Sequence, residues 1–408
     1  MKEVVVTGMG MVSPIGQSPS EVLDSLLAVR SGISLWSAEG FTKTFPAGIV
    51  HGDFDTGFEK KDMPYLDRLT KLGIFAADRA IADAGLPSDL SDLGPRIGIF
   101  SGTVLGGADS ECQWLREHFA AGKQTARPFP MIAGMHNAPA AWISIRHQIT
   151  GPVLTHTAAC ASSGVAIGDA MRWIRQGDLD VAIAGGGEAV LIPPFMGAWD
   201  GLRALARPDA TDVARSCRPF SRNRGGLVLS EGAVFFILES AEHARARGAE
   251  SYASLSGYGV ASDAYHVGAP HARGQTAAMT AALRDAGLRA ADLSYINAHA
   301  TATPTGDPVE VAAIRSVLGD AADTVPVSST KAQHGHLLGA ASAMELAVCL
   351  LAMEHSFLPA TAFLDDIDPA CPLRHVPGIA EQNVQVRHTL SLSAGFGGTN
   401  AALVASKR

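Results

Sequence analysis

The sequence predicts an α/β protein made of two similar halves, with helices packed between sheets. One observation is the succession of a strand, a sharp turn around Cys160 and a helix over residues 151–176. A second is that the order of strands and helices begins again near Gly248. The third is that each half contains a helical pattern rich in small residues, one that follows Cys160 and continues to Gln176 and one at 337–353. Because the two halves have the same order and each contains such a helix, we expect both helices to lie between the sheets.

Composition narrows the classes of protein. With 408 residues, 47% hydrophobic and 18% charged, the chain is long and apolar enough for a large core of two or three domain-sized units. The formal net charge of -8 argues against a general nucleic-acid binder. Five scattered cysteines without paired spacing fit a reducing, cytoplasmic setting. The apolar run at the N-terminus is too short for a signal peptide, and no run of 18 consecutive apolar residues occurs, so we expect no membrane insertion.

The N-terminal half opens with a buried strand over residues 4–10. Its Gly8-x-Gly10 pattern invites a dinucleotide-binding interpretation. Ser13 occupies the third glycine position, and Pro14 disfavours the helix that would hold a pyrophosphate, so we reject this interpretation. The next expected elements are helices at 19–28, 66–84 and 109–121, strands at 96–100, 179–188 and 227–239, irregular sequence up to residue 64, and a loop containing Pro128 and Pro130.

The C-terminal half repeats this order. We expect strands at 251–259, 293–297 and 325–329 and helices at 276–286 and 337–353. We therefore divide the chain into halves at 1–250 and 251–408.

Cys160 is a nucleophile candidate. A thiol at the first turn of a helix faces unpaired N–H groups, and these favour the thiolate. Small residues on both sides leave space for a substrate. The alternative is a buried cysteine that acts as a small apolar residue, which is the commoner role of an arbitrary free cysteine.

Two later histidines lie where strands run into loops or helix starts. His299 follows the strand at 293–297, and His336 precedes the helix at 337–353. Loops at strand ends carry function in α/β folds, although a single histidine is more often an ordinary polar residue. The His334-x-His336 pair suggests a metal, but no companion ligand motif accompanies it, so we expect none.

Four separated segments together resemble the β-ketoacyl-acyl-carrier-protein synthases of the type II elongating class. They are residues 157–163 around Cys160, 297–304 around His299, 331–341 with Lys331 and His336, and 395–400 with Phe396. The resemblance covers essentially the whole chain. It implies a thiolase fold of five layers, α/β/α/β/α, and a 3-oxoacyl-acyl-carrier-protein synthase, an acyltransferase that is usually dimeric.

The resemblance also implies a role for each group. Cys160 would carry the acyl chain, His299 and His336 would stabilise the enolate left by malonyl decarboxylation, and Lys331 would orient them with Glu345 as its partner. The implied supporting residues are Asp307 and Glu310 as braces of the His299 loop, the N–H groups of Cys160 and Phe396 as oxyanion donors, Phe396 as a gate, and Thr301 and Thr303 as binders of the pantetheine arm.

An acyl carrier protein is the implied partner. It would bring phosphopantetheine with it, so no cofactor need be bound by the chain itself. Carrier docking is expected at Arg203, with Arg207, Lys123 and Arg127 as weaker candidates. Both a homodimer and a heterodimer with a chain-length-factor-like subunit stay open.

Three rival members of the same superfamily fit the motifs less well. A degradative thiolase would need a second cysteine within residues 393–400, which contain none. An initiating synthase would have asparagine at the position of His336. A non-catalytic chain-length partner would lack Cys160.

Departures from the family pattern bear on the pathway. Ala300, His334, Leu392 and Ala394 stand where Gly, Thr, Asn and Phe are usual. Some relatives use that Asn in a monovalent-cation site, so we do not expect such a site here. Ala394 removes an aromatic ring beside the gate, and Asp109 is expected to line the acyl tunnel, where a carboxylate would disfavour a plain alkyl chain. We therefore favour a specialised type II polyketide or polyene pathway over housekeeping fatty-acid elongation. Acyl chain length and saturation are not encoded in these motifs.

Overall fold

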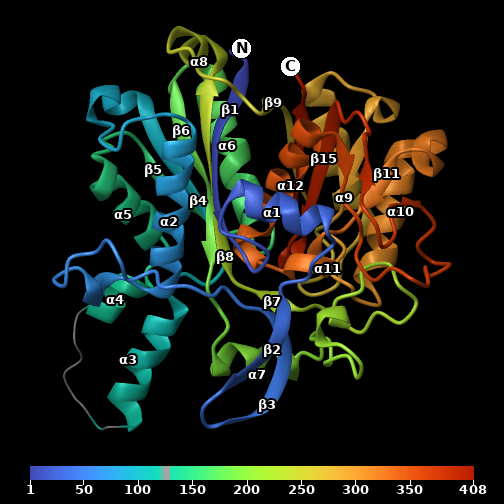
Figure 1. Cartoon of the computed structure of the whole chain (residues 1–408), viewed down its shortest axis with the longest axis horizontal. Helices are drawn as coiled ribbons and strands as arrows, with labels where there is room; N and C mark the ends of the chain where they lie inside the picture. The colour runs from blue at the N-terminus through green and yellow to red at the C-terminus, as the bar shows by residue number, and fades with distance from the viewer. Residues whose placement is uncertain (121, 123–128) are drawn as a thin grey trace.

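The largest feature of the computed structural model is a sheet of eleven strands in the order β13-β11-β10-β15-β16-β9-β1-β8-β6-β4-β5 (Figure 1). The structure describes residues 1–120, 122 and 129–408. Near the middle of the sheet, β1 and β9 pair only through Val5–Ser254 and Val6–Ala253. This short contact joins two sheets that otherwise face each other across the core.

The two sheets follow one plan. In each, a first strand is antiparallel to a second, the second is antiparallel to a third, and the third continues into parallel strands. In the N-terminal half, these strands are β1 (Val4–Val12), β8 (Gly232–Ser240), β6 (Val181–Glu188), β4 (Ile97–Gly102) and β5 (Val153–His156). Their counterparts are β9 (Ala253–Ser262), β16 (Thr399–Ser406), β15 (His388–Ala394), β10 (Tyr295–Asn297) and β11 (Pro326–Ser328), with β13 (Arg374–His375) added at the edge.

Helices complete the five layers, which are seen edge-on in Figure 1. Helices α2 (Arg68–Asp83) and α5 (Ala138–His147) cover the outer face of the first sheet, and α9 (Ala272–Ala286) and α10 (Gly306–Leu318) cover that of the second. Between the sheets lie α6 (Ser162–Gln176) and α12 (Ala341–His355), which contact each other. The predicted α/β fold with five layers is confirmed.

Small residues permit the contact between these central helices. A Cβ atom at Gly164 would lie 2.9 Å from the Ser342 hydroxyl, and one at Gly168 would lie 2.4 Å from the Tyr258 ring. The stretch Leu338–His355 is apolar and long enough to cross a membrane by composition alone, but 89% of it is buried inside the protein. It is therefore the core helix of a folded domain, and residues 338–340 of the predicted helix form a short 3-10 turn before α12.

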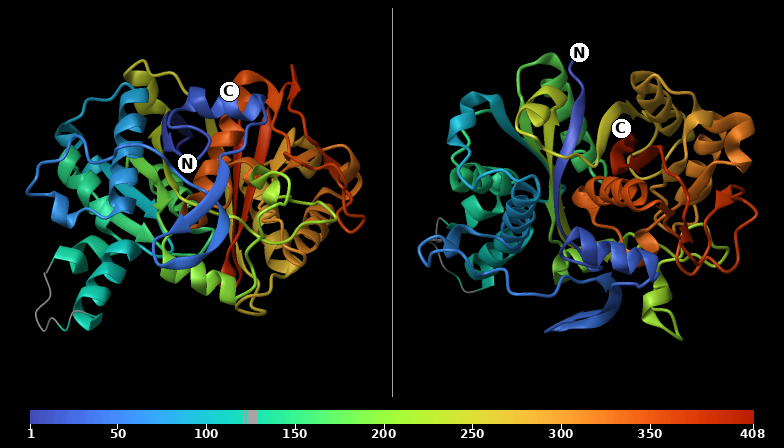
Figure 2. Two further views of the ribbon diagram at one scale, coloured as in Figure 1. Left: turned by 60° about the horizontal axis from the view of Figure 1, so that its bottom comes forward. Right: turned by 45° about the horizontal axis from the view of Figure 1, so that its top comes forward.

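Several elements were not predicted. Strands β2 (Ile33–Ala38) and β3 (Phe41–Gly48) form a hairpin, which projects from one end of the molecule in Figure 2 and pairs with β7 (Leu229–Ser230). Helices α5 and α7 (Pro193–Gly201) have proline in their first turn, where it is tolerated, but in the sequence these prolines read as loop signals. Further elements that were not predicted are α4 (Phe129–Gly134), α8 (Ala241–Ala246), α11 (Lys331–His334), β12 (Phe357–Leu358) and β14 (Glu381–Gln382). Helices α1 (Pro19–Leu27) and α3 (Ala108–Ala120) match the helices expected at 19–28 and 109–121.

The expected boundary at residue 250 falls between β8 and β9. Since β1 pairs with both of these strands, the division of the chain into units at this point stays a prediction.

Candidate active site

Cys160 lies in the tight connection between β5 and α6. The preceding Ala159 has a φ of +49°, a left-handed conformation that is costly for a residue with a side chain and typical of functional turns. The thiol is 7% exposed and lines a cavity of about 450 Å³. The turn thus points a nearly buried sulfur into a space that a substrate can enter.

The thiol is held in its neutral form. Burial raises the pKa of Cys160 to about 12, while the charge of Lys331 and the N–H of Phe396 act in the opposite direction. The expectation that the start of the helix favours a thiolate is wrong for the resting protein. The N–H groups of Ala161 and Ser162 already donate to the carbonyls of Ala158 and Ala159, so they do not face the sulfur.

Two imidazoles face the cavity next to this thiol. The Nε2 atom of His336 lies 3.0 Å from the Cys160 sulfur, and the ring of His299 stands at 84° to that of His336 with 5.2 Å between centroids. Burial, followed by the charge of Lys331, lowers the pKa of both histidines well below its usual value. Each is a neutral imidazole that can donate one N–H and accept one proton.

Lys331 supplies the positive charge behind these rings. Its ammonium group forms a buried ion pair with Glu345 and lies 3.4 Å from Nδ1 of His299. The Ser393 hydroxyl donates to the other oxygen of Glu345 at 3.1 Å. Because an ammonium group only donates, Nδ1 of His299 is its acceptor, and the ring proton of His299 is on Nε2.

Two carboxylates hold the loop that carries His299. Glu310 accepts the N–H of His299 at 2.6 Å, and Asp307 accepts the N–H groups of Thr303 at 3.2 Å and Phe220 at 2.8 Å. Burial raises the pKa of Glu310 to about 8 and that of Asp307 to about 6. Both side chains therefore bond the loop directly, which a charge that only favours a helix start would not do.

The mouth of the cavity combines hydroxyl and aromatic groups. Thr301, Thr303 and Ala394 line it, and the two threonine Oγ1 atoms are 3.4 Å apart. Phe396 is 46% exposed and stacks on Trp199 of α7, with 5.5 Å between ring centroids. The sequence analysis missed Trp199, because α7 read as a proline loop and no motif marked the ring.

Not every predicted site residue reaches the cavity. Asp109 lies in the first turn of α3, where its side chain is exposed to solvent beside Arg68 and Asp67. It does not line the cavity, so its assignment to the acyl tunnel is corrected. Arg203 is exposed at the cavity wall, and Arg207 forms an ion pair with Asp200 at 3.1 Å. Lys123 and Arg127 lie outside the described residues.

The donor atoms of Cys160, His299 and His336 lie within 4.8 Å of one another, which is close enough for a soft metal ion. A nucleophilic thiol with two imidazole donors has the same arrangement. His334 does not join them, because its Nδ1 lies 2.7 Å from the Gly335 carbonyl and its Nε2 lies 3.0 Å from the Thr330 hydroxyl. Of the His334-x-His336 pair, only His336 lies in the site, whereas His334 has a structural role.

Sequence models of a known family match both halves of the chain. The description "Beta-ketoacyl synthase, N-terminal domain" matches residues 1–244, and "Beta-ketoacyl synthase, C-terminal domain" matches residues 252–365. The chain belongs to the β-ketoacyl synthase family. It is an acyltransferase of the 3-oxoacyl-acyl-carrier-protein synthase class, a ketosynthase that joins two acyl units by decarboxylative condensation.

Relatives of this synthase are similar along their full length. Nodulation protein E of Rhizobium meliloti (strain 1021) is 38% identical over 404 residues, which is 98% of each chain. The 3-oxoacyl-[acyl-carrier-protein] synthase 2 of Coxiella burnetii is 36% identical over 415 residues, which cover 100% of this chain and 99% of that one.

Solved ketosynthase structures share its fold. The ishigamide ketosynthase/chain length factor has a TM-score of 0.91 at 32% identity and matches 100% of this chain and 99% of its own. A type II polyketide acyl-carrier protein in complex with its hexaketide-bound ketosynthase gives a TM-score of 0.90 at 30% identity, with 100% of both chains covered.

Proposed function

We propose that Cys160 is the nucleophile that accepts the acyl chain. Its sulfur attacks the carbonyl carbon of an acyl thioester, and His336 Nε2, 3.0 Å away, takes the thiol proton. The new sulfur–carbon bond forms as the bond to the carrier thiol breaks, and His336 returns the proton to that leaving thiolate. The N–H groups of Cys160 and Phe396 receive the oxyanion. The short contact between Cys160 and a neutral His336 is the observation that carries this proposal.

In the second half of the reaction, the histidines act on a malonyl thioester. Loss of CO2 from the malonyl group leaves an enolate, and its oxygen accepts the N–H of His299 Nε2. His336 adds a second N–H donor once its ring proton has moved from Nδ1 to Nε2, because Nε2 is left without a proton after it protonates the leaving carrier thiolate. Lys331 supports this step, because it fixes the ring proton of His299 on Nε2. The enolate carbon then attacks the Cys160 thioester, a carbon–carbon bond forms, and the Cys160 sulfur leaves.

An acyl carrier protein is the proposed partner, and its phosphopantetheine arm is the group that enters the cavity. The hydroxyl groups of Thr301 and Thr303 at the cavity mouth are suited to bond the amides of this arm. Exposed Arg203 on the cavity wall offers a positive charge to an acidic carrier surface. A related ketosynthase has been solved in complex with its acyl-carrier protein.

The partner subunit is proposed to cover the edge strand β5. This strand ends the sheet, and α3, α4 and α5 lie on the same side of the molecule as β5 (Figure 1). Each of these four elements carries an exposed apolar side chain. These side chains are Phe119, 75% exposed, Met131, 65%, Ile145, 60%, and Leu154, 38%. Such a patch beside an open strand edge is suited to a second subunit, either another copy or a chain-length-factor-like protein.

A cytoplasmic location accords with five free cysteines.

For the pathway, we propose a specialised type II polyketide or polyene system. Ala394 lines the cavity where relatives of this family usually have phenylalanine, and this leaves room beside the gate. Asp109, the second residue that pointed to this pathway, does not line the cavity, so Ala394 alone supports it from the structure. Housekeeping fatty-acid elongation is the alternative.

Mass spectrometry of the trapped acyl enzyme tests this function. Incubation with a mixture of acyl carriers, without malonyl carrier, should leave one acyl group on the peptide that contains Cys160. An acyl group on another cysteine, or none, would contradict the assignment. Preference for polyunsaturated or β-keto chains would support the specialised pathway, and preference for saturated C12 to C16 chains would assign the synthase to fatty-acid elongation.

A further inference from the structure

The loop that presents Thr301 and Thr303 has an unfavourable backbone conformation. Ala302, between them, has a φ of +64°, and its side chain is fully buried. Left-handed backbone at a residue other than glycine persists only where the surroundings hold it in place. The turn brings the two threonine Oγ1 atoms to 3.4 Å from each other at the cavity mouth.

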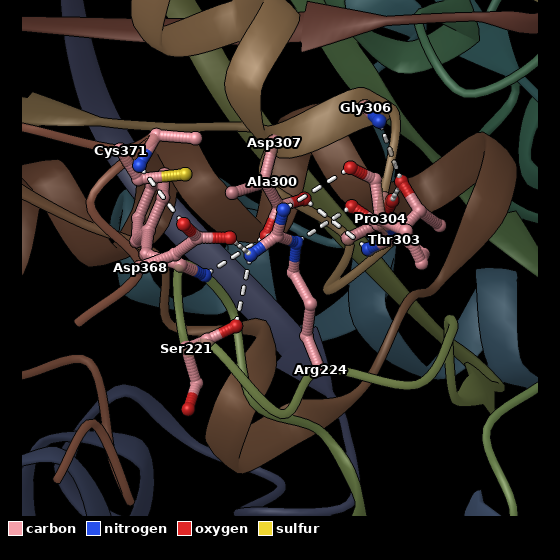
Figure 3. A network of polar contacts seen from close by, with 12 residues as sticks. Ser221, Arg224, Ala300, Thr303, Pro304, Gly306, Asp307, Asp368 and Cys371 are labelled. Carbon is pink, nitrogen blue, oxygen red and sulfur yellow. Dashed lines mark hydrogen bonds and ion pairs between the residues drawn. The ribbon is translucent and has the colours of Figure 1, made fainter. Parts of the chain in front are cut away.

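Arg224 holds this loop from behind, as Figure 3 shows. Its Nε donates to the Thr303 carbonyl at 3.0 Å, and its Nη2 donates to the Pro304 carbonyl at 3.1 Å. The Nη1 atom donates to Asp368 at 2.5 Å and to the Ser221 carbonyl at 2.9 Å. The side chain is 5% exposed, so all three nitrogens of the guanidinium are engaged inside the protein.

Asp307 holds the N–H of the same residue whose carbonyl Arg224 binds. One of its oxygens accepts the N–H of Thr303, and the other accepts the N–H of Phe220 and lies 3.9 Å from Nε of Arg224. The Ala302 carbonyl accepts the N–H of Gly226 at 2.9 Å. The N–H and the carbonyl of Thr303 and the carbonyl of Ala302 therefore all have fixed hydrogen-bond partners.

We propose that Arg224, together with Asp307, is a positioning residue that pre-forms the hydroxyl pair of Thr301 and Thr303 for the pantetheine arm. This inference rests on the proposed function, in which these two hydroxyls bind the arm. Arg224 does not itself line the cavity, and it acts through the carbonyls of Thr303 and Pro304, two residues which do.

The chemistry of the site requires arginine. Two carbonyls of the loop, one of Ser221 and one carboxylate converge on it, and these groups are all acceptors. A planar guanidinium with five donors can satisfy them together, whereas an ammonium group has three donors and less reach. Without Arg224 the loop carbonyls lose their partners, and Ala302 is free to leave its left-handed conformation.

The test is the Arg224→Met variant, measured in two assays. We expect the KM for malonyl carrier to rise about tenfold, while turnover at saturating carrier stays within about threefold of the parent. Alkylation of Cys160 by iodoacetamide, which needs no arm, should keep its rate. Arg224→Lys, which retains the ion pair with Asp368, should raise the KM by about threefold and tests the same point if the methionine variant does not fold.

Two further variants separate positioning from a general loss of structure. Arg222→Met is the matched control, because Arg222 lies in the same segment but is 61% exposed and pairs with exposed Asp366. This variant should keep the parental KM. Adding Ala302→Gly to Arg224→Met should recover part of the lost affinity, since glycine adopts positive φ readily.

Three outcomes would overturn the inference. The first is an unchanged KM in Arg224→Met or Arg224→Lys, and the second is an equal loss of turnover, alkylation and affinity without rescue by glycine. The third involves Thr303→Val. If this variant raises the KM and the Arg224 variants do not, only the positioning role fails, whereas an unchanged KM in Thr303→Val refutes the proposed arm site and this inference with it.

Discussion

The two halves of the synthase share one plan but contribute different chemistry at matching positions. In the N-terminal half, the connection from β5 to α6 carries Cys160, and in the C-terminal half, the matching connection from β11 to α12 carries Lys331 and His336. The connection after β10 adds His299. The first half thus provides the proposed nucleophile, and the second provides imidazole groups and positive charge. We infer that acyl transfer and decarboxylation can be separated by mutation of His299, because His336 serves both steps whereas His299 acts only on the enolate.

The largest effect is expected from removal of the nucleophile. Cys160→Ala should lower condensation by at least about 10⁴-fold, since no other group can hold the acyl chain. Cys112→Ser is the control, because Cys112 lies on α3 and does not line the cavity. The measurement is product formation from acyl and malonyl carriers, and substantial activity in the alanine variant would contradict the role of the first half.

Loss of His299 should act mainly on the other half of the reaction. His299→Ala removes one enolate donor, and we expect decarboxylation of malonyl carrier to fall by about 10² to 10³-fold. Acyl loading of Cys160 should continue, because His336 is the residue that contacts the sulfur. His336→Ala should slow both steps. If His299→Ala loads poorly and decarboxylates normally, the division of roles is wrong.

The pH dependence of stability should report the buried brace of the His299 loop. The pKa of Glu310 is raised to about 8 by burial, so the folded protein holds a proton that the unfolded chain releases above its lower pKa. Stability from this group is therefore complete at low pH and is lost as pH rises through about 8, with a slope of at most about 1.4 kcal/mol per pH unit. Glu310→Gln mimics the protonated form and should flatten the fall in the free energy of unfolding between pH 5 and 8. An unchanged slope in urea titrations would show that Glu310 is ionised in the folded state.

The smallest effect is expected at the cavity entrance. Arg203→Glu should raise the KM for the carrier about three- to tenfold with little change in turnover at saturation, because it removes a charge that meets the carrier and no catalytic group. Arg289→Glu is the matched control for the reversal of charge, since Arg289 is 83% exposed and does not line the cavity. Equal KM values for the two variants would exclude Arg203 from the docking surface.

Sequence patterns predicted the layers better than the fine structure of the site. The mostly apolar sequences of β1, β6 and α12, which are buried throughout, and the 3- and 4-residue apolar spacing of α2 reflect the burial of these elements, so the two halves could be recognised. The hairpin β2–β3 and helix α7 could not, because aromatic residues at irregular spacing and prolines read as loops. Trp199 on Phe396 and Arg224 behind the Thr303 loop result from contacts between distant segments, and no local pattern marks them.

The protonation state of Cys160 also depends on contacts that the sequence does not show. The position of Cys160 at a helix start was correct in outline, but its pKa depends on whether the nearby N–H groups are free. Those of Ala161 and Ser162 are bonded to the turn itself. Asp109 was misplaced for a related reason, because a shift of one residue on α3 decides whether a side chain faces solvent.

CO2 release measured on Cys160→Gln and on the double variant Cys160→Gln/His299→Ala tests the central claim most directly. Glutamine fills the place of the acylated cysteine and cannot accept an acyl group. The single variant should form no condensation product but still decarboxylate malonyl carrier, and the double variant should lose most of that activity. Loss of CO2 release in the single variant, or its persistence at the same rate in the double variant, would contradict the separation of the two roles.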